Sequence, residues 1–109
     1  MGEGKEAEKM KNSIEEYNQA KFNIIRKLYT KKKFSKGHLL YERLEKTLPS
    51  HLRGLAKKVL KDLVKEGLVV WYGRTEHGDA FQLNKGRLRD VEEILAAREK
   101  VNDYSSYEL

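Results

Sequence analysis

The chain has 109 residues and a formal net charge of +6, and charged residues make up 37% of it. This length is enough for one domain with a modest core and too short for two. The absence of cysteine excludes disulfides and thiol catalysis. No apolar run approaches the roughly 18 residues of a membrane span, and the N-terminus lacks the apolar core of a signal peptide. We therefore expect a cytoplasmic protein that does not bind membranes.

The positive charge is concentrated in the middle of the chain. Residues 17–37 contain seven basic and no acidic residues, whereas both ends of the chain are net acidic. One interpretation is that the middle binds an anionic partner. The other is a solvated lysine surface, since enrichment in Lys and Glu without Cys is typical of thermophile proteins.

The N-terminal half predicts an arm followed by two helices. Residues 1–12 are rich in charge and glycine and indicate a flexible N-terminal arm. Apolar residues then recur with helical spacing from residue 13 to about residue 32. Ser35 is a candidate cap for a second helix over about 36–47, and Pro49 closes that helix.

The stretch "SHLRGLAKKVLKDLVKEGLVVWYGR" predicts a helix followed by a strand. Ser50 is expected to cap a third helix over 51–66, and Gly67 to supply its left-handed C-terminal residue. This helix has an apolar stripe that ends at Leu63 and a face rich in lysine. Gly54 costs such a helix about 1 kcal/mol relative to Ala. We expect Gly54 to allow close packing of another helix, with close approach of a ligand's backbone as the alternative.

The C-terminal half predicts a β-hairpin and a last helix. "LVVWYG" and "AFQLN" read as two strands joined by a loop of some six residues, "RTEHGD". Both Trp71 and Tyr72 could face the core, because both sets of alternating positions are apolar. A fourth helix is expected over 87–101, with a polar tail at 102–109. Its apolar spacing allows it either to pair with its copy in a homodimer or to cover the first helix of its own chain.

This order of elements resembles the winged helix-turn-helix superfamily, in the style of MarR-type and ArsR-type regulators. The resemblance covers about residues 14–86. It rests on "LRGLAKKVLKDLVKEGLVVWYGRTEHGDAFQLNKG", and within it on "LVKEGLV" at the end of the third helix. It implies an α+β fold with a three-helix core, a β-hairpin wing and an additional C-terminal helix. The chain has neither the Cys and His set of ArsR-type metal sensors nor the long flanking helices of MarR-type dimers, so no small-molecule ligand is predicted.

The resemblance implies a double-stranded DNA-binding protein, and in particular a transcriptional regulator. Helix 51–66 would lie in the major groove, where a helix fits, and loop 73–79 would act as the wing. The alternative is a winged-helix module for protein–protein interaction in a larger assembly. The residues expected to contact DNA are Ser50, His51, Arg53, Lys57, Lys58, Lys61, Arg74 and His77.

Each of these residue types suits one kind of contact. Arg53 lies near the start of the predicted helix and is the candidate for a forked bond to guanine, whereas the three lysines suit phosphates. Arg74 either contacts DNA or pairs with an acid of its own loop. The run Lys31, Lys32, Lys33 and Lys36 either contacts phosphate or forms a charged corner.

Other chemistry is weakly represented. The three histidines lack zinc spacing and cysteine partners, the glycines do not form a phosphate-binding loop, and no Ser-His-Asp arrangement is indicated. We therefore expect neither an enzyme nor a bound metal or cofactor. Most aromatic residues fall on apolar stripes and are expected in the core: Tyr17, Phe22, Tyr29, Phe34, Tyr41, Trp71 and Phe81.

Overall fold

The computed structural model describes the backbone of residues 2–33 and 37–108, and the side chains of residues 14–33 and 37–98. The elements in chain order are α1 (Gly2–Thr30), β1 (Leu39–Leu40), α2 (Tyr41–Lys46), the 3₁₀ helix η1 (Ser50–Leu55), α3 (Ala56–Glu66), β2 (Val69–Thr75), β3 (Gly78–Leu83), the 3₁₀ helix η2 (Lys85–Arg87) and α4 (Leu88–Glu108). The described chain is thus an α+β fold, which confirms the predicted fold class at this level.

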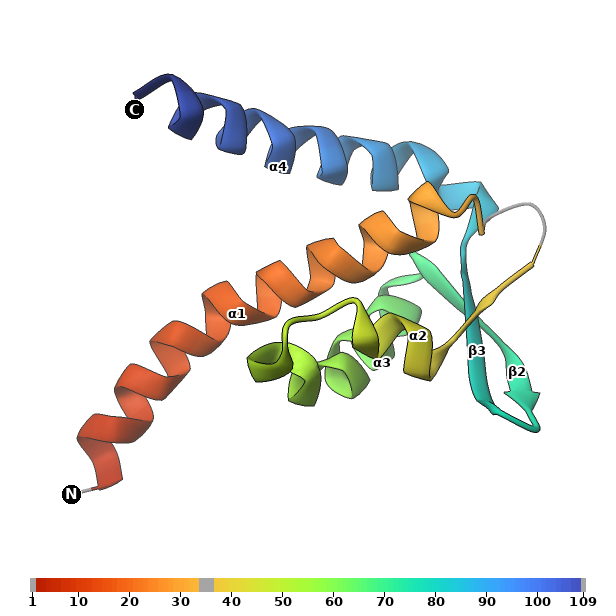
Figure 1. The fold of residues 1–109 in the computed structure, drawn as a ribbon, viewed down its shortest axis with the longest axis horizontal. Coiled ribbons are helices and arrows are strands. Elements are labelled where there is room, and N and C mark those ends of the chain that lie inside the picture. Colours follow the sequence, from red (N-terminus) through yellow and green to blue (C-terminus); the bar gives the residue numbers. More distant parts are fainter. Residues whose placement is uncertain (1, 34–36, 109) are drawn as a thin grey trace.

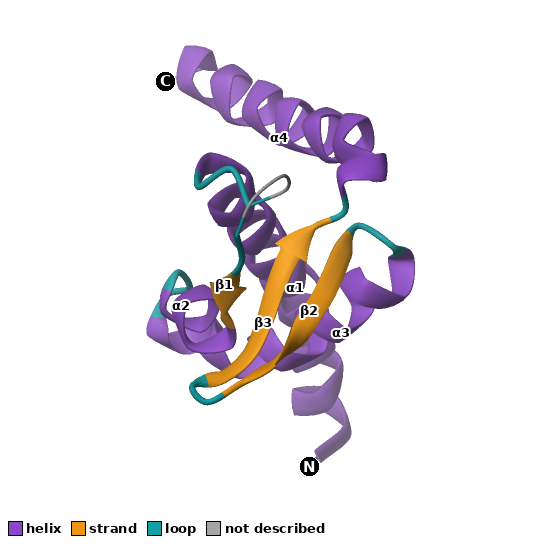
Figure 2. Ribbon diagram, turned by 90° about the vertical axis from the view of Figure 1, so that its right-hand side faces the viewer, coloured by secondary structure: helices purple, strands orange, loops and turns teal. Residues whose placement is uncertain are grey.

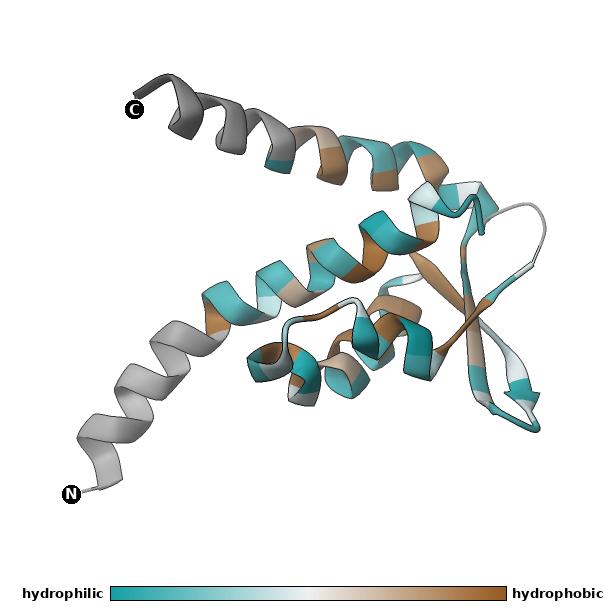
Figure 3. Cartoon of the chain, in the orientation of Figure 1, coloured by the Kyte–Doolittle hydropathy of each residue, from teal (hydrophilic) through white to brown (hydrophobic). Residues whose placement is uncertain are grey.

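Helix α1 is the centre of the fold. Figure 1 shows α4 on one side of α1 and the pair α2 and α3 on the other. Ile24, Ile25 and Leu28 of α1 are completely buried, because apolar residues three and four apart fall on one face of a helix. Brown apolar segments accordingly line the sides of the helices and strands that face one another in Figure 3.

The three strands form an antiparallel sheet in the order β1-β3-β2. Leu39 of β1 lies opposite Phe81 of β3, and Phe81 lies opposite Trp71 of β2. Tyr72 is an extra residue between two registers of the hairpin and forms a β-bulge. Figure 2 shows α1 and α3 behind the sheet, α2 beside β1 and α4 above the sheet.

The bulge explains why the orientation of Trp71 and Tyr72 cannot be read from an alternating pattern. The prediction that Trp71 belongs to the core is wrong, since its side chain is 52% exposed and Tyr72 is 57% exposed. The indole Nε1 of Trp71 donates to Asp79 at 3.2 Å. Phe22 and Phe81 are buried as predicted, Tyr17, Tyr29 and Tyr41 pack partly buried against the core, and Phe34 lies outside the described residues.

Gly67 ends α3 in the way that the sequence predicts. Its φ of 83° is left-handed, and its N–H donates to the carbonyl of Val64 at 3.1 Å. The N–H of Leu68 donates to the carbonyl of Leu63 at 3.1 Å, which completes a Schellman motif. This turn aims the chain directly into β2.

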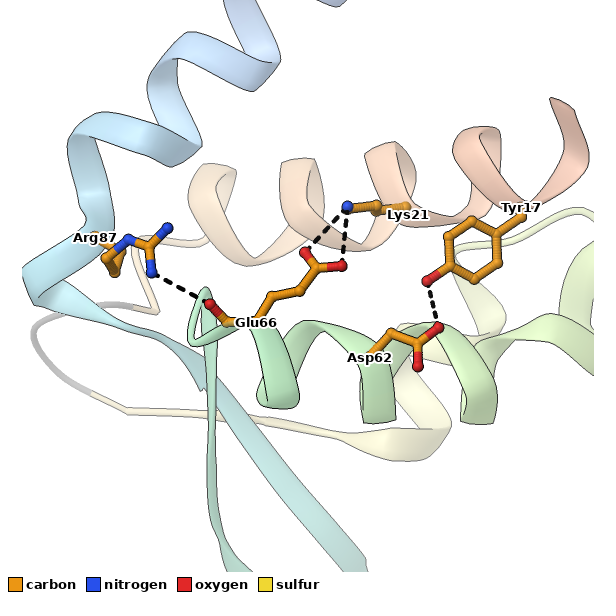
Figure 4. A network of polar contacts seen from close by, with 5 residues as sticks. All are labelled: Tyr17, Lys21, Asp62, Glu66 and Arg87. Carbon is orange, nitrogen blue, oxygen red and sulfur yellow. Dashed lines mark hydrogen bonds and ion pairs between the residues drawn. The ribbon is translucent and has the colours of Figure 1, made fainter. Parts of the chain in front are cut away.

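Polar contacts fix α3 to α1 and to η2, which directly precedes α4 (Figure 4). The Tyr17 hydroxyl donates to Asp62 at 2.6 Å, and Lys21 pairs with Glu66 at 3.2 Å. Arg87 donates from Nη1 to the backbone carbonyl of Glu66 at 3.2 Å. These contacts hold the C-terminal half of α3 in place, at Asp62 and at Glu66.

Several predicted boundaries differ from the structure. α1 begins at Gly2 and not at residue 13, because the Glu, Lys and Ala of the predicted arm are good helix formers. α4 runs to Glu108, through most of the predicted tail. The second helix begins only at Tyr41, because the backbone of Leu39–Leu40 pairs with β3. The predicted cap at Ser35 lies outside the described residues.

Candidate functional site

Helix α3 has one buried face and one basic face. Val59, Leu60 and Leu63 are at most 2% exposed and hold the helix on the domain. The lysines on the other side are all exposed: Lys57, Lys58, Lys61 and Lys65. Lys65 was not among the predicted site residues, although its four-residue spacing from Lys61 already placed it on this face.

One of these lysines is partly neutralised. Lys58 lies 3.8 Å from the carboxylate of Asp62, one turn further along α3. The hydrogen bond from Tyr17 lowers the pKa of Asp62, and the neighbouring lysines lower it further, against the opposing effect of desolvation. Burial, together with the bond to Asp62, raises the pKa of Tyr17. Lys57 and Lys61 form no ion pair with any carboxylate of the described chain, so they remain available to an external anion.

The N-terminal part of the predicted third helix is not α-helical. Ser50, His51 and Arg53 belong to the 3₁₀ helix η1, in which the N–H of Leu52 donates to the carbonyl of Pro49 at 2.9 Å. Pro49 rather than Ser50 is the N-terminal cap, so the predicted capping role of Ser50 is wrong. Tight turns of this kind are common at helix N-termini, and the glycine at position 54 weakens the competing α-helix.

Arg53 is exposed, and one nitrogen of its guanidinium is hydrogen-bonded within its own chain. Its Nε donates to the backbone carbonyl of Leu48 at 3.2 Å. The two terminal nitrogens of the guanidinium have no partner among the described residues, so they can still form a fork to an external acceptor pair. Holding Nε reduces the freedom of the side chain before any ligand binds.

Gly54 does not serve close helix packing, and that prediction is wrong. A Cβ built on Gly54 would meet no atom within 4 Å. Its side of η1 is exposed, so the absent side chain leaves open space at the surface.

The hairpin tip is tighter than predicted. β2 and β3 extend to Thr75 and Gly78, which leaves Glu76 and His77 as a two-residue turn in place of the predicted six-residue loop. The Thr75 hydroxyl donates to the Gly78 carbonyl at 2.8 Å and accepts from the His77 N–H at 3.1 Å. Arg74 and His77 are both exposed, at the end of the hairpin. Arg74 forms no ion pair with the described acids of its own hairpin.

The apolar face of α4 is used within the chain. Val91 is completely buried and Leu95 is 8% exposed in the same core as α1. Tyr29 donates to Glu92 at 2.7 Å, and Arg98 donates to Gln19 at 2.7 Å. These contacts favour the alternative in which α4 covers α1 of its own chain. The side chain of Val101, the last residue of the predicted stripe, lies outside the described residues.

The described residues provide neither a metal site nor a membrane span. They contain no group of three or more His, Cys, Asp or Glu side chains that could hold a metal ion. None of their helices is long and apolar enough to cross a bilayer. Comparison with known proteins adds no assignment: no family model, no curated protein and no solved structure matches this chain.

Proposed function

We propose that this protein binds double-stranded DNA as a winged helix-turn-helix domain and acts as a transcriptional regulator. The observation that carries the proposal is the basic face of α3, whose lysines are exposed while the opposite face is buried. A helix anchored in this way can enter a major groove without exposing core residues. Phosphates are natural partners for Lys57 and Lys61, whose charges are not paired within the described chain.

The order of the elements supports the same proposal. A helix, a short strand, two helical segments and a hairpin follow one another, and the sheet order is β1-β3-β2. In this arrangement the hairpin formed by β2 and β3 would serve as the wing, with Arg74 near its tip. The terminal nitrogens of Arg53 would be the candidate for reading a guanine edge.

A salt-titrated binding assay tests the proposal. Fluorescence anisotropy of a labelled duplex should show affinity falling linearly with salt on logarithmic axes, with a slope of about −4 to −5 for some five phosphate contacts. Lys57→Gln and Lys61→Gln should each weaken binding to every sequence alike and reduce the slope by about one. Arg89→Gln removes an exposed charge from α4, on the far side of α1, and should leave both values unchanged. A salt-independent signal, or equal losses in all three variants, would refute the role of α3.

The alternative, a protein-interaction module, is favoured by one observation. Three neighbouring residues of β2 have exposed apolar side chains: Val70, Trp71 and Tyr72. Large apolar side chains gathered on a surface often mark contact sites. This alternative predicts no duplex binding at low salt, so the same assay separates the two functions.

A further inference from the structure

A basic cavity lies beside β1, and none of its described lining residues belongs to α3. Its volume is about 510 Å³, within the range of sites for small ligands. Two leucines of β1 form part of its wall. Its polar lining comes from the turn after α1, the residue before β1, α2 and the hairpin tip, and consists of Lys31, Lys33, His38, Arg43, Thr75 and His77.

The charges around this cavity are of one sign. Among the described residues, three cationic side chains and two imidazoles line it, and no carboxylate does. Glu42, next to Arg43 in the chain, is paired with Lys46 at 3.0 Å. None of the basic lining residues forms an ion pair within the part of the chain that the structure describes. A concave surface with this lining concentrates anions.

His38 supplies a second, independent observation. Its Nδ1 is buried and has no hydrogen-bond partner in the part of the chain that the structure describes. The ring is stacked on Tyr72, with the centroids 4.4 Å apart and 24° between the planes. A buried nitrogen without a partner costs free energy, so Nδ1 is a polar atom of the cavity wall that the described fold leaves unsatisfied. The stack holds the ring in place at the cavity wall.

We propose that this cavity binds a phosphate group. Arg43, Lys31 and Lys33 supply charge-assisted hydrogen bonds to its oxygens, and the imidazoles of His38 and His77 line the cavity beside them. Thr75 is already bonded within the hairpin turn and acts by fixing the position of His77. The phosphate belongs either to a nucleic acid backbone or to a free phosphorylated compound. In the first case the inference rests on the proposed function, and in the second it is independent of it.

Pyrophosphate is the probe for the site. Its titration to roughly 10 mM at constant ionic strength, followed by the imidazole ¹⁵N resonances of uniformly labelled protein, should give saturable shifts of His38 and His77. Arg43→Gln should weaken pyrophosphate binding by about tenfold or more, since it removes a charged hydrogen-bond donor. Arg43 is exposed, so the variant should fold as the wild type does. The control variant Lys57→Gln, which removes a charge from α3, should keep the wild-type affinity for pyrophosphate. Chemical shifts that do not saturate, or equal losses of pyrophosphate affinity in Arg43→Gln and Lys57→Gln, would refute the proposed site.

A short duplex separates the two sources of phosphate. If the site holds a backbone phosphate, pyrophosphate should compete with the duplex, and Arg43→Gln should weaken duplex binding as well. If it holds a free phosphorylated compound, Arg43→Gln should lose pyrophosphate and keep duplex affinity. Both results support a phosphate site. If wild-type protein binds pyrophosphate but no duplex, the proposed DNA binding is wrong and the phosphate site still stands.

Discussion

Replacing Gly54 by alanine should stabilise the protein. A Cβ at this position meets no atom within 4 Å, so it adds neither a clash nor a contact. Gly54 does not have a positive φ, so alanine can adopt its conformation. The effect therefore comes from the unfolded chain, which has less freedom with alanine, and from the better helical propensity of alanine. These contributions amount to about 0.4–1 kcal/mol.

A melting curve measures this gain. For a domain of this size, 1 kcal/mol shifts the melting temperature by about 4–8 °C, so Gly54→Ala should raise it by about 2–8 °C. Circular dichroism at 222 nm follows the transition, and urea unfolding gives the free energy without extrapolation in temperature. A lowered melting temperature would show that the position is packed or strained, which would refute the open surface around η1.

Gly67→Ala is the matched control, because the chemical change is the same and the backbone is different. Gly67 has a φ of 83°, and its Cβ position lies 3.4 Å from the guanidinium of Arg87. Left-handed backbone costs an alanine about 1–2 kcal/mol, which exceeds the gain from the unfolded chain. The two variants should therefore change stability in opposite directions. Equal shifts would mean that the effect does not come from the local backbone conformation.

Two further predictions concern α4 and the pH dependence of Asp62. Leu95→Ala should lower the free energy of unfolding by about 2–3 kcal/mol in a denaturant titration, the lower part of the range for a buried leucine, and light scattering should give an unchanged mass. A loss of mass would instead assign Leu95 to a dimer seam. Tyr17→Phe should raise the pKa of the Asp62 carboxyl, measured by ¹³C NMR, because the hydrogen bond is the largest cause of its lowering. Since the folded pKa lies below the unfolded one, the stability that Asp62 contributes is present above about pH 4, is lost as the pH falls through the folded pKa, and should be smaller in Tyr17→Phe. An unchanged pKa would mean that the lysines alone set it.

The parts of the fold that depend on local signals follow from the sequence. Gly67 ends α3 as predicted, because only the local backbone decides that turn. The pairing of β1 could not be predicted, since Leu39 and Leu40 fit a helical stripe equally well and become a strand only beside β3. The bulge at Tyr72 likewise depends on how two strands fit together.

The same distinction applies to the candidate sites. The lysines of α3 are recognisable from helical spacing alone, because one element carries them all. The basic cavity brings together residues from the turn after α1, from α2 and from the hairpin, so no spacing in the sequence reveals it. Lys31 and Lys33 were singled out only as part of a charged run, and Arg43 and His38 had no signal that set them apart as ligands.

The bulge at Tyr72 also bears on how the protein behaves at high concentration. β2 forms an edge of the sheet, and its sequence "VVWY" combines high β-propensity with no charge. An edge of this kind is a template on which a second molecule can add a strand and begin an aggregate. The extra residue bends the strand after Trp71, and Arg74 follows with a charge, so the regular edge is only a few residues long. Deleting Tyr72 would therefore lengthen the flat, uncharged part of this edge, and we expect such a variant to aggregate more readily than the native chain.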